Sequence, residues 1–345
     1  MKKIKKTDIA GLLNQWQKEF TVLVPSRESG VAEMVVWDGT DTNFLDWYRN
    51  TVIPAKANIL PNIEKMFGFH KDGDGYQLEL PADSEQKQLI FGIRPCDARA
   101  ISIVDMLFKD AYEDTYYLNK RKNTVLIGMG CVNPYDSCFC TSLGFGPTEK
   151  TGVDLMLTDI GDEFLIEAVT DEGKELLSGI EGIAEASQDD ESKAASARDS
   201  ASQKITREID TKEIAKGLSL AFENKEFWEK IAAKCVSCGI CTFLCPTCHC
   251  FDINDEKVRA DGARFRNWDS CSFSQYTKMP MENPRDEKWR RVRQKVYHKY
   301  TFYPMLFDVT ACTGCGRCIR QCPVNWDITQ TLSNVPAEAT TGTEK

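Results

Sequence analysis

Histidine is scarce in this chain, with 3 in 345 residues, and the motifs of common catalytic centres are absent. The sequence contains no Walker loop, no H-E-x-x-H pair and no convincing Ser/His/Asp order. The run from Gly128 to Cys131 begins like a dinucleotide-binding fingerprint, but Asn133 stands where the next glycine is expected. These absences argue against histidine-based catalysis and against a nicotinamide or flavin site on this polypeptide.

The chain also has fewer basic than acidic residues, and it lacks long apolar runs. Lys and Arg number 43 against 52 Asp and Glu, so the net charge of −9 does not favour binding to nucleic acid through phosphate neutralisation. The lysine-rich start is followed by a stretch, residues 7–20, that polar side chains interrupt, so we expect neither a signal peptide nor a membrane span. With no export signal and many thiols, we expect a protein of the reducing cytoplasm.

Cysteine, by contrast, is abundant, and two runs share the spacing C-x2-C-x2-C-x3-C-P. The first run comprises Cys235, Cys238, Cys241 and Cys245, and the second comprises Cys312, Cys315, Cys318 and Cys322. This spacing is typical of bacterial two-cluster ferredoxins, in which the fourth cysteine of each run ligates the other cluster. We therefore predict one 4Fe-4S cluster on Cys235, Cys238, Cys241 and Cys322, and a second on Cys312, Cys315, Cys318 and Cys245.

Zinc is the main alternative for these runs, because it also binds four cysteines. Zinc sites usually pair two C-x2-C knuckles across a longer loop, whereas here three evenly spaced cysteines precede a Cys-Pro in both copies. Gly239, Gly314 and Gly316 suit a tight wrap around a cluster, since glycine tolerates backbone angles that a side chain would penalise. Iron-sulfur clusters are therefore the favoured interpretation, and disulfides are the weakest one.

Four further cysteines lie near the ends of two predicted strands in the N-terminal part. Cys96 follows the strand predicted at 89–93, and Cys131 follows the strand predicted at 124–129, with a helix predicted at 98–109 between them. In a parallel βαβ unit both would emerge at the carboxyl edge of the sheet, where α/β proteins usually place their sites. Cys138 and Cys140 could complete a third 4Fe-4S site; zinc, or plain buried thiols, are the alternatives.

The order of predicted elements indicates an α+β protein. We expect a mixed α/β domain at 1–185, a low-complexity connector at 186–207, a helical, bacterial-ferredoxin-like two-cluster domain at 208–331, and a polar tail at 332–345. Residues 187–203 are rich in small and charged side chains, which favours a solvent-facing helix or a mobile connector. A helix is predicted over 211–233, leading into the first cysteine run.

A basic run at 285–299 stands out in this acidic chain. Such a run is most often a solvated helix face. The alternative is charge compensation, because a cubane held by four thiolates is anionic, and nearby cations would raise its reduction potential. Arg317, inside the second cysteine run, is well placed for the same role.

Five motifs together resemble the 4Fe-4S dicluster subunits typified by the one in anaerobic sulfite reductase. The beta subunits of cytoplasmic nickel-iron sulfhydrogenases and the iron-sulfur subunits of heterodisulfide-reductase-linked flavin oxidoreductases are similar. The motifs lie at residues 91–97, 138–140, 245–251, 268–271 and 312–318. The resemblance implies an electron-transfer subunit that works between a separate FAD/NAD(P)H-binding flavoprotein and a terminal reductase or hydrogenase of sulfite reductase, hydrogenase or heterodisulfide reductase type.

Two other functions remain open at this stage. The N-terminal cysteines could hold an incompletely ligated cluster that reduces a substrate, which would make the chain an enzyme with its own active site. Alternatively, zinc could stabilise that domain as a scaffold, leaving only the C-terminal clusters redox-active. The sequence does not identify the terminal acceptor, the direction of electron flow, or the roles of Cys248, Cys250 and Cys271.

Overall fold

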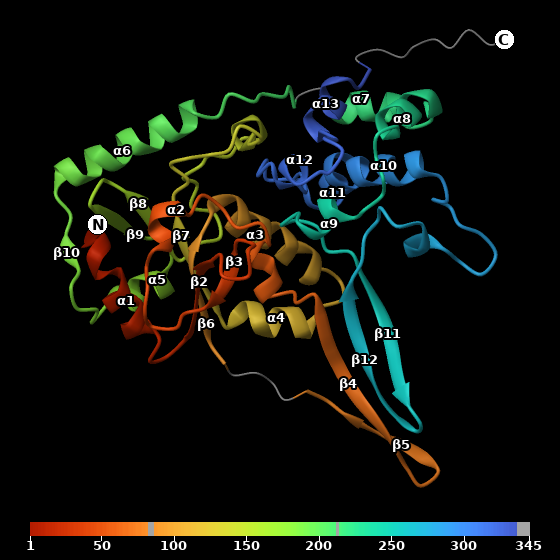
Figure 1. The fold of residues 1–345 in the computed structure, drawn as a ribbon, viewed down its shortest axis with the longest axis horizontal. Coiled ribbons are helices and arrows are strands. Elements are labelled where there is room, and N and C mark those ends of the chain that lie inside the picture. The colour runs from red at the N-terminus through yellow and green to blue at the C-terminus, as the bar shows by residue number, and fades with distance from the viewer. Residues whose placement is uncertain (82–85, 212–213, 337–345) are drawn as a thin grey trace.

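Most of the N-terminal half folds around one eight-stranded sheet (Figure 1). The computed structural model describes residues 1–81, 86–211 and 214–336. The strands of this sheet are β1 (Lys2–Lys5), β2 (Thr21–Ser26), β3 (Glu33–Val36), β6 (Gln88–Ile93), β7 (Thr124–Met129), β8 (Leu155–Asp159), β9 (Glu163–Ala168) and β10 (Ala184–Glu185). Their order is β10-β1-β9-β8-β7-β6-β2-β3, and the four central strands β8, β7, β6 and β2 run parallel.

The two central strands β6 and β7 are apolar along nearly their whole length. Every residue of β7 is buried, as expected for a parallel strand covered on both faces. Leu89 of β6 pairs with Val125 of β7 in parallel register, which confirms the predicted βαβ unit. Apolar segments at 153–158 and 163–169 also predict a hairpin around residues 159–162, and it is present as the antiparallel pair β8–β9.

Helices of the N-terminal half cover this sheet. They are α1 (Ile9–Trp16), α2 (Phe44–Trp47), α3 (Pro95–Phe108), α4 (Thr115–Lys122), α5 (Asp171–Leu177) and α6 (Gln188–Gln203), with short 3-10 turns η1 (Lys6–Asp8), η2 (Ala55–Asn58) and η3 (Cys140–Leu143). Helix α3 begins three residues earlier than predicted, because Pro95 has the fixed backbone angle that suits a first helical position. The early start places Cys96 in the first turn of α3.

The segment predicted as a connector contains the long helix α6. Ser187 caps the helix through a capping box with Asp190, which explains where it begins. Ala194 and Ala201 are buried on the side of α6 that contacts β8 and β9. Of the two alternatives for this segment, the structure therefore has the helix, and it packs on the sheet through its small side chains.

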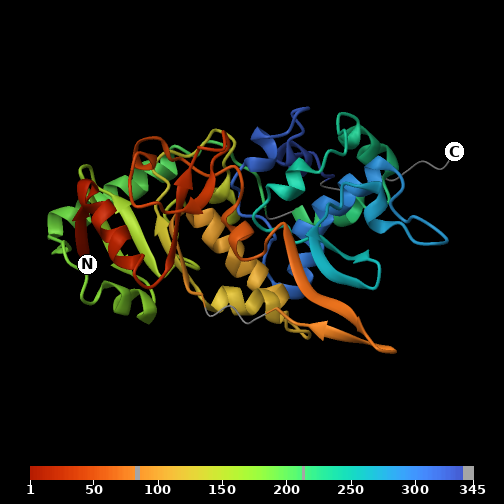
Figure 2. The ribbon, with the colours of Figure 1, turned by 60° about the horizontal axis from the view of Figure 1, so that its bottom comes forward.

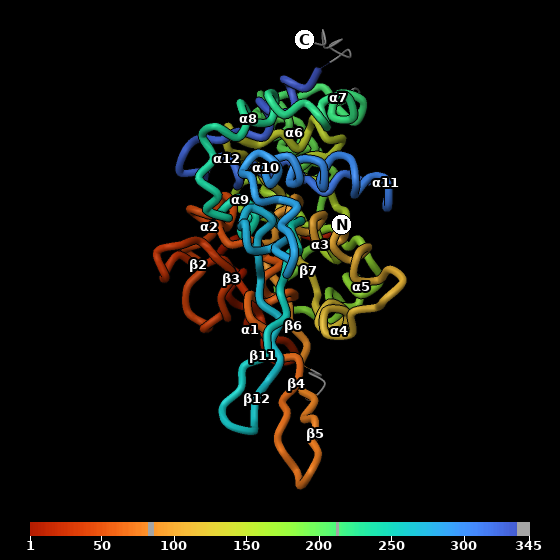
Figure 3. The backbone as a smooth tube through the Cα atoms, turned by 90° about the vertical axis from the view of Figure 1, so that its right-hand side faces the viewer, coloured from red at the N-terminus to blue at the C-terminus, as the bar shows by residue number. Residues whose placement is uncertain are grey.

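A second, four-stranded sheet joins segments that are far apart in the sequence. Its strands are β4 (Ile63–Asp72), β5 (Gly75–Glu79), β11 (Phe251–Val258) and β12 (Asp261–Trp268), in the order β11-β12-β4-β5. Figure 3 shows the two hairpins side by side, extending away from the body of the molecule. The N-terminal and C-terminal halves therefore share this sheet through the β4–β12 pair.

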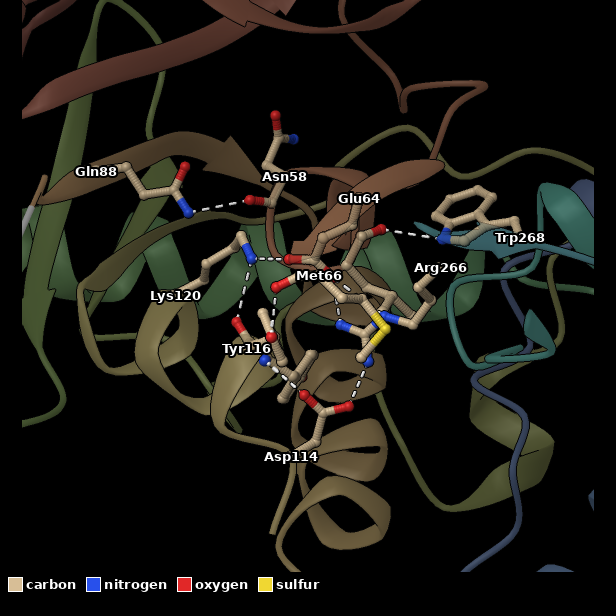
Figure 4. Close-up of polar contacts among 11 residues, drawn as sticks. Asn58, Glu64, Met66, Gln88, Asp114, Tyr116, Lys120, Arg266 and Trp268 are labelled. Carbon is tan, nitrogen blue, oxygen red and sulfur yellow. Dashed lines mark hydrogen bonds and ion pairs between the residues drawn. The ribbon is translucent and has the colours of Figure 1, made fainter. Parts of the chain in front are cut away.

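A buried ionic network fastens the shared sheet to helix α4 (Figure 4). The Arg266 guanidinium donates to Glu64 on β4 and to Asp114, which precedes α4. Lys120 of α4 also pairs with Glu64, and the Tyr116 hydroxyl donates to the Met66 carbonyl at 2.5 Å. Arg266 is 1% exposed, so its charge relies on these carboxylates.

Replacing Arg266 with methionine should lower the free energy of unfolding by roughly 2–3 kcal/mol, because Glu64 loses one of its two cationic partners inside the protein. The matched control is Arg264→Met on the same strand, whose ion pair with Asp255 is exposed. That change should cost no more than about 1 kcal/mol. Anaerobic denaturant unfolding measures the loss of stability in both variants. Equal losses would show that the buried network stabilises the protein no more than the exposed ion pair does.

The C-terminal half is mainly helical and lies beside the α/β half in Figure 2. Its elements are α7 (Ile214–Ala221), α8 (Lys225–Ala232), α9 (Ile240–Phe243), η4 (Ser274–Thr277), α10 (Lys288–Tyr297), the π-helical turn η5 (His298–Phe302), α11 (Tyr303–Phe307), α12 (Arg317–Arg320) and α13 (Ile328–Ser333). The helix predicted over 211–233 is split into α7 and α8 by a turn at 222–224, where Asn224 caps α8. The core of this half is rich in aromatic side chains, including Trp228 and Tyr297.

The architecture confirms the predicted α+β class, with a mixed α/β N-terminal half and a helical C-terminal half that carries the cysteine runs. Across the part of the chain that the structure describes, no helix combines the length and apolarity needed to cross a membrane. Residues 332–336 of the predicted polar tail are described, and α13 extends into them; residues 337–345 lie outside the described part.

Candidate iron-sulfur sites

The two cysteine runs fold in the same way. In each run a glycine in the left-handed region, Gly239 (φ 77°) or Gly316 (φ 70°), stands immediately before a short helix, α9 or α12. The third cysteine of each run, Cys241 or Cys318, lies on that helix. A residue with a β-carbon would be strained at either glycine, so this wrap follows directly from the C-x2-C-G and C-G-x-C patterns.

The predicted second set lines one enclosed cavity of about 20 Å³. Its walls include Cys312, Cys315 and Cys318 from the second run and Cys245 from the first, which is the crossed pattern expected from two-cluster ferredoxins. Cys241 reaches the same cavity from α9. The structure therefore brings the four predicted ligands together.

The walls of this cavity also carry two buried lysines, and neither forms an ion pair with a carboxylate of the described residues. Lys299 donates to the Cys245 sulfur at 3.2 Å, to Thr247 Oγ1 at 3.1 Å and to the Ala311 carbonyl at 3.0 Å. Lys295 is 4% exposed, and its Nζ has no hydrogen-bond partner within the described residues. Burial opposes its charge, yet Cys241 and Cys318 nearby hold the pKa of Lys295 above its ordinary value. A buried ammonium beside cysteine sulfurs, with no carboxylate of the described residues paired to it, fits an anionic cluster in this cavity.

Replacement of Lys299 by methionine should make the midpoint potential of the second cluster more negative by roughly 60 mV. The variant loses the hydrogen bond from the Lys299 ammonium to Cys245, which stabilises the more negative, reduced cluster by ~1.4 kcal/mol more than the oxidised cluster. EPR-monitored redox titration measures the change. Lys288→Met on the same basic run is the control. Lys288 donates to the Ala233 carbonyl and to no cysteine sulfur among the described residues, so this change should leave the potential unchanged. Equal potentials in all three proteins would contradict a tuning role for Lys299.

The predicted first set is less enclosed. Cys235 and Cys322 border the aromatic core of the C-terminal half, whereas Cys238 is exposed. Backbone N–H groups point at two of these sulfurs: Trp326 donates to Cys322 at 3.1 Å and Ser237 to Cys235 at 3.4 Å. Such donors are common around cluster thiolates and make them easier to reduce.

The four N-terminal cysteines line a second enclosed cavity of about 30 Å³, comparable in size to the first. Cys96 lies in the first turn of α3, directly after β6, and Cys131 lies two residues after β7, so both emerge at the carboxyl edge of parallel neighbours. Cys138 and Cys140 close the cavity from the following loop. The residues that the sequence groups together are therefore close in space.

Burial sets the chemistry of these thiols. It raises the pKa of Cys138 to about 11 and that of Cys140 to about 12. A thiolate in this apolar cavity therefore needs a bound cation, and iron or zinc ions would supply one. The donor set of four cysteines fits a 4Fe-4S cluster, and it also fits zinc.

The N-terminal site is joined to the second cysteine run by backbone contact. The Phe139 N–H donates to the Gly314 carbonyl at 2.9 Å, and the Cys138 thiol donates to the Cys315 carbonyl at 3.6 Å. A β-carbon at Gly314 would lie 2.5 Å from the Cys140 nitrogen, which leaves no room for any side chain. Cys315 consequently borders both cavities.

A buried ion pair strengthens the same junction. Arg317, between Cys315 and Cys318, donates to both oxygens of Asp97 at 2.6 Å, and Asp97 adjoins Cys96. The guanidinium also donates to the Thr51 carbonyl at 2.9 Å and to Asn50 at 2.7 Å. Asn50 in turn donates to the Cys96 sulfur at 3.6 Å. One arginine thus connects the loop of the second set to the first turn of α3.

Two comparisons with known proteins found matches. Residues 234–326 match the 4Fe-4S dicluster domain family, which implies two 4Fe-4S clusters in the C-terminal half. Over 326 residues the chain is 30% identical to sulfhydrogenase 2 subunit beta of Pyrococcus furiosus, covering 93% of this chain and 94% of that protein. No solved structure matches the chain significantly.

Proposed function

Because the chain belongs to the family of sulfhydrogenase beta subunits, we propose that it is the electron-relay subunit of a multi-subunit oxidoreductase. A 4Fe-4S cluster exchanges one electron at a time, which is the chemistry needed between a hydride donor and a one-electron acceptor. The chain would contribute the thiolate ligands, the buried cations beside them and the packing that excludes water. Residues 208–331 would form the two-cluster domain, and residues 1–185 the domain with a third cluster.

The observation that carries this proposal is that Cys315 borders both enclosed cavities. A cluster on Cys96, Cys131, Cys138 and Cys140 would therefore adjoin the cluster on Cys245, Cys312, Cys315 and Cys318. The cluster on the remaining set would lie at the other end of the relay, next to the second cluster, because Cys241 also lines that cluster's cavity. The remaining set is Cys235, Cys238, Cys241 and Cys322. This arrangement gives an order of N-terminal, second and first cluster along one relay.

The partners follow from the same proposal. The relative's name describes a beta subunit, so it functions with other subunits. We propose that a flavoprotein that binds FAD and NAD(P)H exchanges electrons with one end of the relay. A terminal reductase or hydrogenase would take the other end, consistent with the absence of a dinucleotide fingerprint and of histidine-based catalytic motifs in this sequence.

Substrate reduction at the N-terminal site is the competing function. It requires an iron with an open coordination position, whereas four cysteines line the cavity and supply a complete ligand set. The relay is therefore favoured over a substrate-reducing centre. Substrate reduction would be favoured instead if the isolated chain reduced sulfite or a disulfide and if replacing the N-terminal cysteines abolished that activity.

The test is metal and sulfide analysis of the anaerobically purified chain, together with EPR spectra of the reduced state. About twelve irons per chain without zinc supports the three-cluster relay, because each cubane holds about four. About eight irons with one zinc would make the N-terminal site structural. About eight irons without zinc would leave those four cysteines as thiols and end the third-cluster proposal.

A further inference from the structure

Two cysteines outside the predicted cluster sets lie against each other at the open end of the β11–β12 hairpin. Cys250 immediately precedes β11, and Cys271 follows β12 by three residues. The antiparallel pairing of Phe251 with Trp268 brings the two segments together, and the Asp269 N–H donates to the Cys250 carbonyl at 3.0 Å. The Cys250 and Cys271 side chains are in hydrogen-bond contact.

Three donors surround the Cys250 sulfur. They are the Cys271 thiol, the Cys271 backbone N–H and the Tyr276 hydroxyl. The Cys271 thiol contributes most, and together the donors lower the pKa of Cys250 to about 6 although burial opposes this. The same contact and burial hold the pKa of Cys271 well above its usual range. Cys250 is therefore the thiol of the pair that ionises more readily, and Cys271 is the one that keeps its proton.

Exposure divides the pair in the same way. Cys271 is 7% exposed, whereas Cys250 is only partly buried. An accessible thiolate backed by a buried thiol is the arrangement required for attack on a disulfide followed by resolution.

The pair also adjoins the first predicted cluster set. The Cys271 sulfur lies 3.9 Å from Thr242 Oγ1 on α9, and Thr242 follows Cys241 in the chain. Electrons held near Cys241 would therefore have a short path to the pair.

We propose that Cys250 and Cys271 form a redox-active dithiol that reduces small disulfides. The Cys250 thiolate attacks one sulfur of the substrate, a Cys250–substrate bond forms, and the substrate disulfide breaks to release one thiolate. The Cys271 thiol then passes its proton to the thiolate already released and attacks Cys250, which forms the Cys250–Cys271 disulfide and releases the second thiolate. The substrate gains two electrons, and the dithiol loses two.

Reduction of the Cys250–Cys271 disulfide back to one thiolate and one thiol needs two electrons and one proton. The reductant is a one-electron iron-sulfur donor acting twice, so this part of the inference rests on the relay function proposed above. The exchange step itself does not depend on the relay, because it uses only the two cysteines and the substrate.

The experiment uses the anaerobic, cluster-loaded full chain and the uncharged probe hydroxyethyl disulfide. Peptide mapping should find a Cys250–Cys271 disulfide in the oxidised protein. Cys250→Ser should slow release of the probe's thiol by at least about tenfold, since the attacking thiolate is gone. Cys271→Ser should stop at a mixed disulfide on Cys250 with one thiol released. Cys248→Ser, the matched control, should behave like the parent.

A second measurement needs no variant. Alkylation of Cys250 by iodoacetamide, followed by mass spectrometry, should be half-maximal near pH 6, because the reactive thiolate is present above the pKa and lost below it. Half-maximal alkylation above pH 8 would overturn the inference. Loss of about four irons in Cys250→Ser or Cys271→Ser would also overturn it, by making these residues cluster ligands.

The outcomes separate this inference from the relay. A chain with about twelve irons that forms no Cys250–Cys271 disulfide refutes the dithiol and leaves the relay intact. A chain that forms the disulfide but holds no N-terminal cluster supports the dithiol while removing the third cluster from the relay.

Discussion

Replacement of Arg317 by methionine will lower the free energy of unfolding by about 3–5 kcal/mol, because Asp97 is left as an uncompensated charge inside the protein. Both side chains are fully buried, and the guanidinium makes five hydrogen bonds to Asp97, Thr51 and Asn50. Anaerobic denaturant unfolding of the cluster-loaded protein measures the loss. It should be accompanied by altered EPR signals, since Arg317 lies between Cys315 and Cys318.

Arg320→Met is the matched control for this change. Arg320 lies on the same helix α12 and donates to the Ser137 hydroxyl and the Cys315 carbonyl, but it is partly exposed and no carboxylate in the described residues pairs with it. Its loss should cost about 1 kcal/mol. A double variant, Asp97→Leu with Arg317→Met, should recover much of the stability by removing both charges. Equal losses in Arg317→Met and Arg320→Met would contradict the role assigned to the ion pair.

A combined change of Cys138 and Cys140 to serine should reduce the iron content from about twelve to about eight per chain, because one cubane loses two of its ligands. The clusters on the two ferredoxin-type runs should remain, since none of their ligands is altered. Iron and sulfide analysis gives the count, and EPR identifies the signal that disappears.

Ser137→Ala is the control, because it alters the same loop without removing a thiol. Ser137 accepts a hydrogen bond from Arg320 and is buried, so the variant tests whether disturbing the loop alone releases iron. It should retain about twelve irons. An unchanged count in the double cysteine variant would show that the N-terminal cysteines hold no cluster, and loss of zinc in place of iron would assign that site to zinc.

The sequence predicted those elements of the fold that depend on interactions within a short segment of the chain. The apolar runs of β6 and β7, and the hairpin of β8 and β9, follow from patterning along short segments. The shared sheet did not follow from the sequence. Of its strands, only β5 overlaps an apolar run that predicts a strand, at residues 76–80. Strand β11 is almost entirely exposed, with polar residues along both faces. Its pairing with β12, and that of β12 with β4 about two hundred residues earlier, depends on tertiary contacts that no short window contains.

The grouping of cysteines in space was more predictable than the fold around them, because the spacing of cysteines along the chain follows the geometry of cluster ligation. The structure groups Cys245 with the second run and Cys96 with Cys131, as expected. What the sequence could not show is which cations face the sulfurs. The basic run at 285–299 was an ambiguous signal, and the structure turns Lys295 and Lys299 inward while Lys288 is only partly buried. The partner of Arg317, Asp97, is 220 residues away and had no signal linking the two.

Direct contact between Gly314 and the backbone of Cys140 has a kinetic consequence. Many electron-transfer proteins carry their cofactor on a domain that swings between donor and acceptor, and that movement, on the microsecond to millisecond scale, then limits turnover. Here the two halves meet with no space for a side chain, and the Arg317–Asp97 pair holds them there. In the proposed relay an electron would pass from one half to the other without waiting for a rotation or a hinge movement. The rate of electron transfer through this chain should then be limited by how fast its partner proteins bind and dissociate.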